Sequence, residues 1–217
     1  DSHIFCREDQ MAQEIESCLD FMRYVYGILG FEFSLKLSTR PEKYIGDIEN
    51  WNKAESLLKA ALDNFGQAWE IKGDETFDGP KIDVTILDAL QREHQCGTIQ
   101  IDFKRPLEFD LTYMTAAGGA SGDSKRERPV MIHQTILGSV EQMMAIVMES
   151  CGGRWPFWLS PFQAIVLSFS EDCDQYAKQV RASVCKAGFQ CDIDIDHDRQ
   201  FEKKLLMAQE AQYNFML

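Results

Sequence analysis

Residues 81–103 decide the fold of the first part of the chain, and they read Lys-Ile-Asp-Val-Thr-Ile-Leu-Asp-Ala-Leu-Gln-Arg-Glu-His-Gln-Cys-Gly-Thr-Ile-Gln-Ile-Asp-Phe. Two apolar runs rich in β-branched residues, 81–90 and 98–103, predict two strands. The runs follow one another with no helical pattern between them, as strands do in an antiparallel sheet. We therefore expect an α+β fold for this part of the chain.

The segments on either side extend this sheet and add helices to it. Apolar residues at helical spacing predict helices over 8–29, 51–65 and 135–150. Residues 115–128 are rich in Gly, Ala and Ser and are expected to form a flexible surface loop. The remaining expected strands are 3–6, 31–37, 67–72, 109–114 and 129–133.

The pattern changes after Trp158, where strands and helices alternate. This alternation predicts a small α/β unit with a mostly parallel sheet. The expected elements are a strand at 164–169, a helix at 173–187, a strand at 190–195, a helix at 201–211 and a strand at 213–217.

Two further features of the chain have a structural interpretation. Every second residue from Asp192 to Asp198 is acidic, which is more typical of the wet face of a strand than of a metal site. His197 is expected to be exposed on that face, and His94 is expected to be structural.

Composition bounds the class of protein. The 217 residues are 45% hydrophobic and 26% charged, as in a globular protein of one large or two small domains. Lys and Arg total 22 against 35 Asp and Glu, a formal charge of −13, which excludes a generally basic nucleic-acid coat protein. No apolar run approaches the roughly 20 residues that cross a bilayer, so no membrane is expected as a partner.

The seven cysteines are scattered along the chain, which indicates reduced thiols in an intracellular protein. We therefore expect a cytoplasmic location. The chain starts and stops inside expected strands, which favours a piece of a longer protein.

Seven collinear stretches resemble threonyl-tRNA synthetases, which are class II aminoacyl-tRNA ligases. The resemblance implies the C-terminal part of an antiparallel-sheet catalytic core over 1–158 and a truncated α/β anticodon-binding domain over 162–217. It implies a homodimer that activates threonine with ATP and Mg²⁺ and transfers it to tRNA(Thr). The stretches are DSHIFC (1–6), LSTRPEKYIG (37–46), GPKID (79–83), QCGTIQIDF (95–103), IH (132–133), ILGSVE (136–141) and WPFWLSP (155–161).

The resemblance also implies a zinc ion that binds the amino and hydroxyl groups of threonine. In the family the ligands are one Cys and two His, and His3 and His133 match the two His, whereas the Cys lies upstream of Asp1. A polar site that demands the hydroxyl rejects similar amino acids better than an apolar pocket does. Spacing alone leaves open that both are ordinary core histidines.

Four residues match the substrate side of the family's site. Asp1 matches a carboxylate that receives the threonine hydroxyl, and Gln100 matches a substrate-side amide. Lys81 follows Gly-Pro and is expected to place a cation beside a carboxylate or phosphate, unless it is simply exposed at a turn. Ser139 either caps a helix or contacts threonine.

The nucleotide side is matched by Gln95, Glu141 and Gln142. Residues five apart on a strand point to opposite faces unless a bulge intervenes. We therefore expect Gln95 and Gln100 to reach one cleft only if a bulge lies near Gly97.

Four positions depart from the family's pattern, all toward less positive charge. The third class II motif ends in Glu-Arg, whereas this chain has Gln142, and losing such a cation costs about 3 kcal/mol, or roughly a hundredfold in rate. Gln134 and Phe162 stand where the family has Arg, and Asp78 stands where it has Tyr.

No catalytic residue is assigned. The hypotheses are a working ligase, a non-catalytic synthetase-like protein that binds tRNA or a partner, and a partial gene product.

Overall fold

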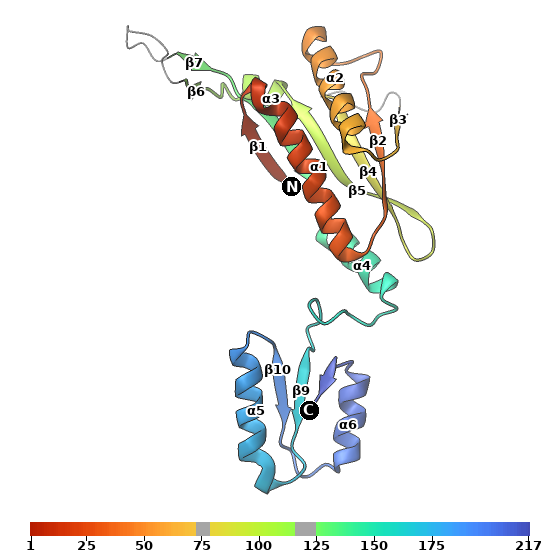
Figure 1. Cartoon of the computed structure of the whole chain (residues 1–217), viewed down its shortest axis with the longest axis vertical. Helices are drawn as coiled ribbons and strands as arrows, with labels where there is room; N and C mark the ends of the chain where they lie inside the picture. Colours follow the sequence, from red (N-terminus) through yellow and green to blue (C-terminus); the bar gives the residue numbers. More distant parts are fainter. Residues whose placement is uncertain (73–78, 116–124) are drawn as a thin grey trace. The chain divides into compact units, whose positions relative to one another are not determined.

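The computed structural model of the chain describes residues 1–72, 79–115 and 125–217 (Figure 1). It divides into two compact units, Asp1–Val147 and Met148–Leu217. Position 78 and most of the expected loop at 115–128 therefore lie outside the described residues. Within them, no helix is both long enough and apolar enough to cross a membrane.

The first unit is built on a six-stranded sheet in the order β1-β8-β5-β4-β2-β3. Four of its five neighbouring pairs are antiparallel, and β3 joins the edge parallel to β2. The expected α+β class with an antiparallel sheet is therefore confirmed. The strands are β1 (Ser2–Cys6), β2 (Phe33–Ser38), β3 (Trp69–Lys72), β4 (Lys81–Leu87), β5 (Glu93–Asp102) and β8 (Val130–Thr135).

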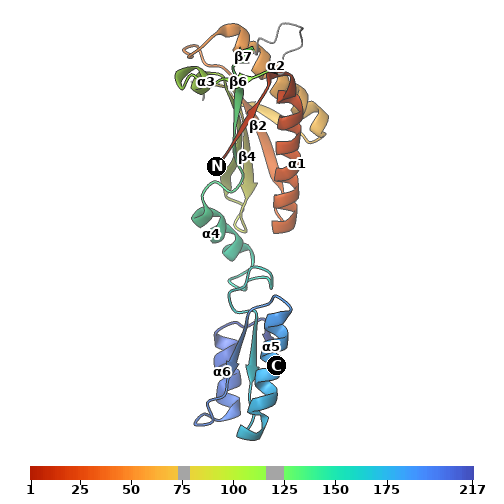
Figure 2. The same ribbon diagram turned by 90° about the vertical axis from the view of Figure 1, so that its left-hand side faces the viewer.

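Two long helices, α1 (Met11–Leu29) and α2 (Ile48–Phe65), lie on one side of this sheet (Figure 2). A short 3₁₀ helix, η1 (Glu8–Gln10), leads into α1. The Asp47 side chain accepts a hydrogen bond from the Glu49 N–H at 3.2 Å and so caps the N-terminus of α2. Both helices end at a glycine in the left-handed conformation, Gly30 and Gly66, a common way for a helix to terminate.

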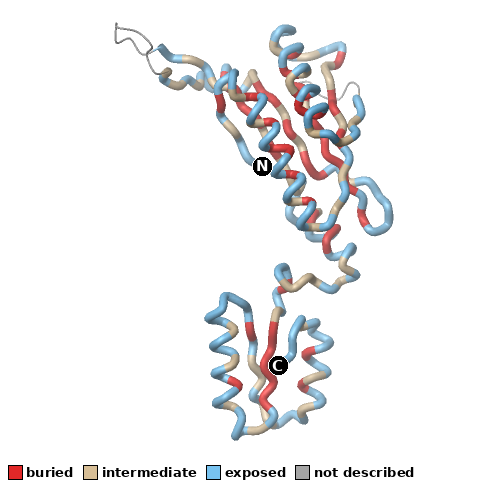
Figure 3. Tube along the Cα trace, in the orientation of Figure 1, coloured by how far each residue is buried: buried red, intermediate tan, exposed pale blue. Residues whose placement is uncertain are grey.

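The core lies between these helices and the sheet (Figure 3). Alternation along each strand places its apolar side chains on the helix side, where burial of their surface drives folding. The apolar side chains that are at most 2% exposed include Ile15, Leu19, Met22, Tyr26, Leu35, Leu37, Leu58, Leu62, Ile82, Val84, Ile86, Ile99, Ile101 and Ile132.

Several expected elements differ from the observed ones. Strand β4 ends at Leu87 rather than at 90, and β5 begins at Glu93 rather than at 98. Helix α3 (Lys104–Glu108) precedes a strand of only two residues, β6 (Tyr113–Met114), where a strand over 109–114 was expected. That strand pairs with β7 (Arg126–Glu127), which lies in the expected loop. Asp102 Oδ1 accepts the N–H groups of Lys104 and Arg105 at 2.8 and 2.9 Å, and this side-chain turn starts α3.

Helix α4 (Val140–Ser150) begins later than the expected start at 135. Strand β8 continues to Thr135, and Gly138 has φ +72°, which a helix does not accommodate. Apolar spacing continues through such a segment, so it cannot locate the boundary.

The β4–β5 hairpin is closed by Asp88. Its carboxylate is buried and accepts hydrogen bonds from the N–H groups of Leu90 and Arg92, both at 2.9 Å, and from the Arg92 side chain. His94 Nε2 lies 2.8 Å from the same carboxylate, so His94 has the structural contact that was expected of it. Burial acts to raise the pKa of Asp88, but these donors outweigh it and hold that pKa far below the usual range.

The second unit is a three-stranded parallel sheet, as expected. Strand β9 (Ala164–Leu167) lies between β10 (Cys191–Asp194) and β11 (Phe215–Met216). Ala164 and Val166 pack with α5 (Asp174–Lys186), which the 3₁₀ helix η2 (Glu171–Cys173) precedes. Ile165 and Leu167 pack with α6 (Phe201–Glu210). Alternate residues of β9 thus meet different helices, which cover opposite faces of the sheet.

Candidate functional site

The sheet face turned away from α1 and α2 is polar. Strand pairing aligns one row of side chains across all six strands, and a second row lies beside it. Paired residues share a face, so both rows belong to the same side of the sheet. The first row is His3, His133, Gln100, Lys81, Ser38 and Lys72, and the second is Thr135, Thr98, Asp83, Lys36 and Glu70.

His3 and His133 form one end of the first row. Their ring centroids are 4.9 Å apart, edge to face. His133 Nε2 lies 2.8 Å from Oδ2 of Asp102, whose side chain is 8% exposed. A carboxylate in this position fixes the orientation of an imidazole and leaves Nδ1 for another partner.

Two imidazoles, one of them held by a carboxylate, fit two of the ligands of a zinc site. Among the residues that the structure describes, no group of three His, Cys, Asp or Glu side chains is placed to hold a metal ion. The described part of the chain therefore offers a pair of ligands and not a complete set.

Lys81, Asp83, Gln95 and Ser38 form a compact polar cluster near the middle of the face. Lys81 Nζ lies 3.0 Å from Asp83 Oδ1, and Gln95 Nε2 donates to the same oxygen at 2.7 Å. Ser38 Oγ donates to Asp83 Oδ2 at 2.9 Å. The Asp83 side chain is 2% exposed and that of Lys81 20% exposed, so the cluster presents the amine and the amide while its carboxylate is covered.

A bulge brings Gln95 onto this face. Val84 pairs with Gly97, but the next residue of β4, Thr85, pairs with Gln95, so Cys96 is the extra residue of β5. The bulge that the sequence required near Gly97 is thus present. Gln100 completes the row and donates from Nε2 to the carbonyl of Gly79 at 3.4 Å.

Gly79 cannot be replaced without moving backbone. A Cβ atom at this position would lie 2.2 Å from the carbonyl oxygen of Ile101. The Gly-Pro step therefore lets the chain pass close to the end of β5 immediately before Lys81.

The start of α4 lies over the bulge. Ser139 Oγ accepts a hydrogen bond from the N–H of Gln142 at 3.0 Å, so of its two expected roles the helix cap is the one that the geometry displays. A Cβ atom on Gly138 would lie 2.9 Å from Oε1 of Gln142 and 3.4 Å from the Cα of Cys96. Gln142 therefore lies close to Gly138, in the turn before α4 that passes beside Cys96 of the bulge. Glu141 is exposed.

Thr135 Oγ1 donates a hydrogen bond to Asp1, which places Asp1 beside the second row. Gln134 points the other way: it is 7% exposed, and its Nε2 donates to the carbonyl of Cys18 in α1. The change from the family's Arg to Gln134 therefore does not alter the charge of the polar face, because strand alternation turns this side chain toward the helices.

Two functional candidates escaped sequence reasoning, Asp83 and Asp102. Each stands two residues after a predicted site residue, Lys81 and Gln100 respectively. Period-two alternation puts such residues on one face, and that was the signal available. The alternation does not show which of the residues on that face form a hydrogen bond or ion pair with one another.

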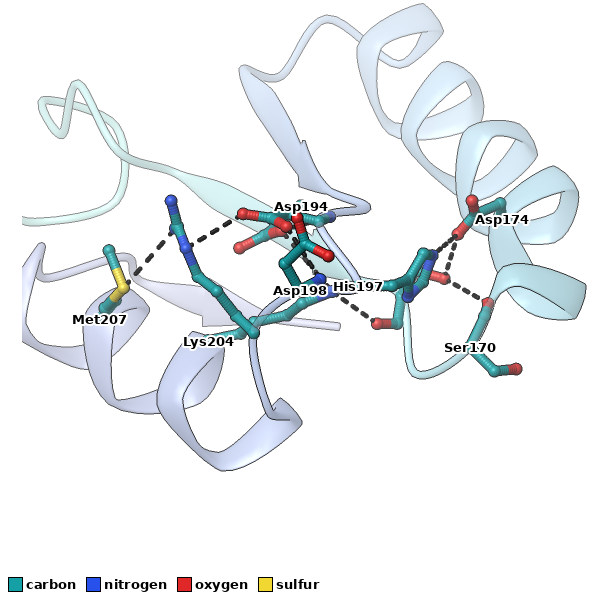
Figure 4. Close-up of polar contacts among 10 residues, drawn as sticks. Ser170, Asp174, Asp194, His197, Asp198, Lys204 and Met207 are labelled. Atoms are coloured by element: carbon teal, nitrogen blue, oxygen red, sulfur yellow. Dashed lines mark hydrogen bonds and ion pairs between the residues drawn. The ribbon is translucent and has the colours of Figure 1, made fainter.

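The second unit has a polar cluster of its own (Figure 4). Ser168 Oγ donates to Asp174 Oδ1 at 2.6 Å, and His197 Nε2 lies 3.0 Å from the same oxygen. Lys204 Nζ is buried, donates to the carbonyl of Ser168 at 3.1 Å and lies 3.6 Å from Asp194 Oδ1.

These contacts correct two expectations. The side chain of His197 is 24% exposed and bound to Asp174, so it is not a free surface histidine. Strand β10 ends at Asp194, and the N–H of Asp196 donates to the Asp194 side chain at 2.9 Å. The acidic series therefore spans a strand and the turn after it, because local side-chain hydrogen bonds of Asp compete with strand pairing.

The chain thus combines an antiparallel sheet, with helices on one face and a polar row on the other, with a following α/β unit. The tRNA synthetase class II core domain (G, H, P, S and T) matches residues 1–151, and the anticodon binding domain matches residues 163–217. The chain therefore belongs to the class II aminoacyl-tRNA synthetase family.

Within this class the chain is similar to threonine–tRNA ligases. It is 53% identical over its whole length to threonine–tRNA ligase 1, cytoplasmic, of Rattus norvegicus, and 52% identical to the Homo sapiens protein of that name. The mitochondrial threonine–tRNA ligase of Homo sapiens is 50% identical over 99% of the chain. The chain spans 31%, 30% and 29% of these proteins, respectively.

Solved structures show the same similarity to threonyl-tRNA synthetases. The crystal structure described as the RNA binding domain of threonyl-tRNA synthetase from Cryptosporidium parvum Iowa II is 47% identical, with a TM-score of 0.87 over 99% of this chain and 53% of that one. A threonyl-tRNA synthetase described as putative from Aeropyrum pernix shares the fold, at 22% identity and a TM-score of 0.68 over 98% of this chain and 51% of that one. The resemblance to threonyl-tRNA synthetases seen in the sequence is confirmed.

Proposed function

We propose that the chain is the threonine- and ATP-binding part of the catalytic core of a threonine–tRNA ligase, over 1–158, followed by part of its anticodon-binding domain, over 162–217. The observation that carries this proposal is the single row that joins His3, His133, Gln100 and Lys81. One continuous face then offers imidazoles, an amide and a cation to an amino acid and its activating nucleotide.

Threonine is bound at the histidine end of the row. His3 and His133 hold zinc together with a third ligand from outside this chain, and Asp102 keeps His133 in its ligating orientation. When bound, zinc supplies a Lewis-acidic position for the amino and hydroxyl groups of threonine. Asp1, beside Thr135, accepts a hydrogen bond from the threonine hydroxyl, and Gln100 contacts the amino acid from the same row.

ATP, with Mg²⁺, is bound toward the bulge. Threonyl-adenylate forms when the threonine carboxylate attacks the α-phosphate and pyrophosphate leaves. Positioning and charge neutralisation dominate such a step. Lys81 faces the reacting carboxylate or phosphate, Gln95 and Glu141 contact the nucleotide, and Gln142 stands beside it without the charge of an arginine.

A second function is favoured by Gln142. A neutral amide in place of a forked cation weakens the hold on triphosphate, so a synthetase-like protein that binds tRNA or a partner without catalysis is the alternative. Asp78 supports the same alternative from the sequence, and it lies outside the described residues.

The test compares the natural protein that contains these residues with its Gln142→Arg variant. Threonine-dependent ATP–pyrophosphate exchange is measured for both, with serine as the control amino acid. Exchange in the natural form supports a working ligase. Exchange that appears only in the variant supports a cleft that is intact except for the arginine replaced by Gln142. The alternative function, binding of tRNA or a partner without catalysis, is then favoured. Absence of exchange from both overturns the proposal.

Dimerisation and location complete the proposal. We propose that the whole protein is a homodimer in the cytoplasm, with threonine, ATP and tRNA(Thr) as its substrates. The names of the two cytoplasmic relatives support the location, although the human mitochondrial ligase is nearly as similar. Sedimentation of the natural protein and fractionation of its source cells test the two points.

A further inference from the structure

Asp83 is a carboxylate enclosed by the groups of the proposed site. It lies on β4, two residues after Lys81, and the residue as a whole is 1% exposed. Its Oδ1 receives Gln95 Nε2 at 2.7 Å and lies 3.0 Å from Lys81 Nζ, while its Oδ2 receives Ser38 Oγ at 2.9 Å. An ionised carboxylate only accepts hydrogen bonds, so three donors converge on it with matching polarity.

The arrangement links groups from three strands. Lys81 belongs to β4, Gln95 is brought to this face by the bulge of β5, and Ser38 ends β2. Lysine and glutamine side chains are long and have many rotamers, and a shared buried acceptor selects one rotamer of each. The amine and the amide are thereby held next to each other before a ligand arrives.

We propose that Asp83 is the positioning residue of the activation site, orienting Lys81 toward the acyl or phosphate group and Gln95 toward the nucleotide. This inference rests on the proposed function. Asp83 does not touch the substrates in this proposal; it acts through the two side chains that do.

The alternative is that Asp83 only stabilises the sheet, and the chain offers a matched control for it. Asp88 is a second buried carboxylate, 2% exposed, that follows the same strand and closes the β4–β5 hairpin. Its partners are Leu90, Arg92 and His94, none of which belongs to the proposed site. Asp83→Asn and Asp88→Asn both remove one buried charge from this hairpin, but only the first reaches Lys81 and Gln95.

The first measurement is pyrophosphate exchange by the natural protein, or by its Gln142→Arg variant if only that form is active. It is made in five backgrounds: unchanged, Asp83→Asn, Lys81→Met, the double variant of these two, and Asp88→Asn. Misplacing a reacting group by about 1 Å costs up to roughly a hundredfold. We expect Asp83→Asn to lower kcat/KM by about ten- to a hundredfold and to have little further effect once Lys81 is Met. Asp88→Asn is expected to lower it by less than about threefold.

The second measurement needs no activity. Acetylation of individual lysines is followed by mass spectrometry in the unchanged protein and in both Asn variants. Without its anionic partner the Lys81 amine is expected to react several-fold faster in Asp83→Asn, with other lysines unchanged, and no such increase is expected in Asp88→Asn.

The outcomes separate the two proposals. Exchange that falls equally in Asp83→Asn and Asp88→Asn, or effects of Asp83→Asn and Lys81→Met that simply add, overturn the positioning role while the ligase proposal stands. Absence of exchange in the unchanged and Gln142→Arg forms overturns the ligase proposal. Lys81 labelling then decides the contact: a selective increase in Asp83→Asn supports the positioning of Lys81, and an unchanged rate overturns it.

Discussion

Gln95 and Gln100 lie on the same face of β5 although five positions separate them along the strand. In a regular strand an odd separation puts two side chains on opposite faces. Cys96, the extra residue of the bulge, shifts the alternation by one position and returns Gln95 to the face that carries Gln100. The bulge is therefore what places a nucleotide-side candidate and a substrate-side candidate on one surface.

Gly97 pairs with Val84 beside the bulge and is closely packed, and the first prediction tests this packing. A Cβ at this position would lie 2.9 Å from Tyr26 Oη and 2.9 Å from Val84 Cβ. We expect Gly97→Ala to lower the free energy of unfolding by about 1–3 kcal/mol, as overpacking does, measured by urea denaturation. The control is Gly27→Ala in α1, where nothing lies within 4 Å, and this change is expected to stabilise by about 0.5–1 kcal/mol. Equal effects of both changes would show that the packing around Gly97 is loose.

Sequence patterns predicted the layers of the fold well because these depend on the average periodicity of long segments. The two long helices of the first unit and the alternating second unit follow from it. Boundaries were less predictable, because single hydrogen bonds set them. Asp102 starts α3 between the two expected strands at 98–103 and 109–114, where no helix was expected, and the cap at Ser139 together with the positive φ of Gly138 makes α4 begin later than expected.

The candidate site likewise has features that the sequence predicted and features that it did not. Residue type and motif pointed to His3, His133, Lys81 and Gln100, and the register puts all four in one row. The orientation of Gln134 toward α1 follows from its alternation with His133 along β8, but its hydrogen bond to the Cys18 carbonyl cannot be predicted from the sequence.

The second prediction concerns the carboxylate behind His133. Asp102 accepts hydrogen bonds from the backbone of Lys104 and Arg105 and holds His133 Nε2. Removing such an outer partner weakens metal binding by about 10–100-fold. We expect Asp102→Asn to weaken zinc binding of the natural protein by this factor, measured by competition with a chelator. Asp110→Asn is the control, because Asp110 is 86% exposed and its positive φ suits Asn. An unchanged zinc affinity in Asp102→Asn would argue against the metal role of the histidine pair.

The third prediction is a pH dependence from Asp88, whose folded-state pKa lies far below the value of about 3.9 for an unfolded aspartate. A lowered folded-state pKa stabilises the fold at pH values above the unfolded pKa, and this contribution is lost as pH falls toward the folded pKa. We therefore expect Asp88→Asn to be less stable than the unchanged protein at pH 7 and to lose less stability between pH 5 and pH 2. Unfolding free energies measured across that range check it, with exposed Glu32→Gln as the control. Parallel curves for the unchanged protein and Asp88→Asn would contradict the assignment.

The last prediction concerns the buried lysine of the second unit. Lys204 Nζ donates to the carbonyl of Ser168 and lies near Asp194, so it joins the ends of β9 and β10 to α6. Its side chain is 1% exposed, and hydrogen bonds from charged groups contribute about 1.5–3 kcal/mol each. We expect Lys204→Met to destabilise the second unit by about that amount, because the methionine fills the space but leaves the Ser168 carbonyl and the Asp194 carboxylate without their cation.

Hydrogen exchange resolved by residue measures this effect where it occurs. Faster exchange in β9, β10 and α6 is expected in Lys204→Met, with the first unit unchanged. Lys203→Met is the matched control, since the neighbouring Lys203 is exposed on the same helix. If both variants exchange alike, the Lys204 amine contributes nothing to the stability of the second unit beyond the packing of its aliphatic chain.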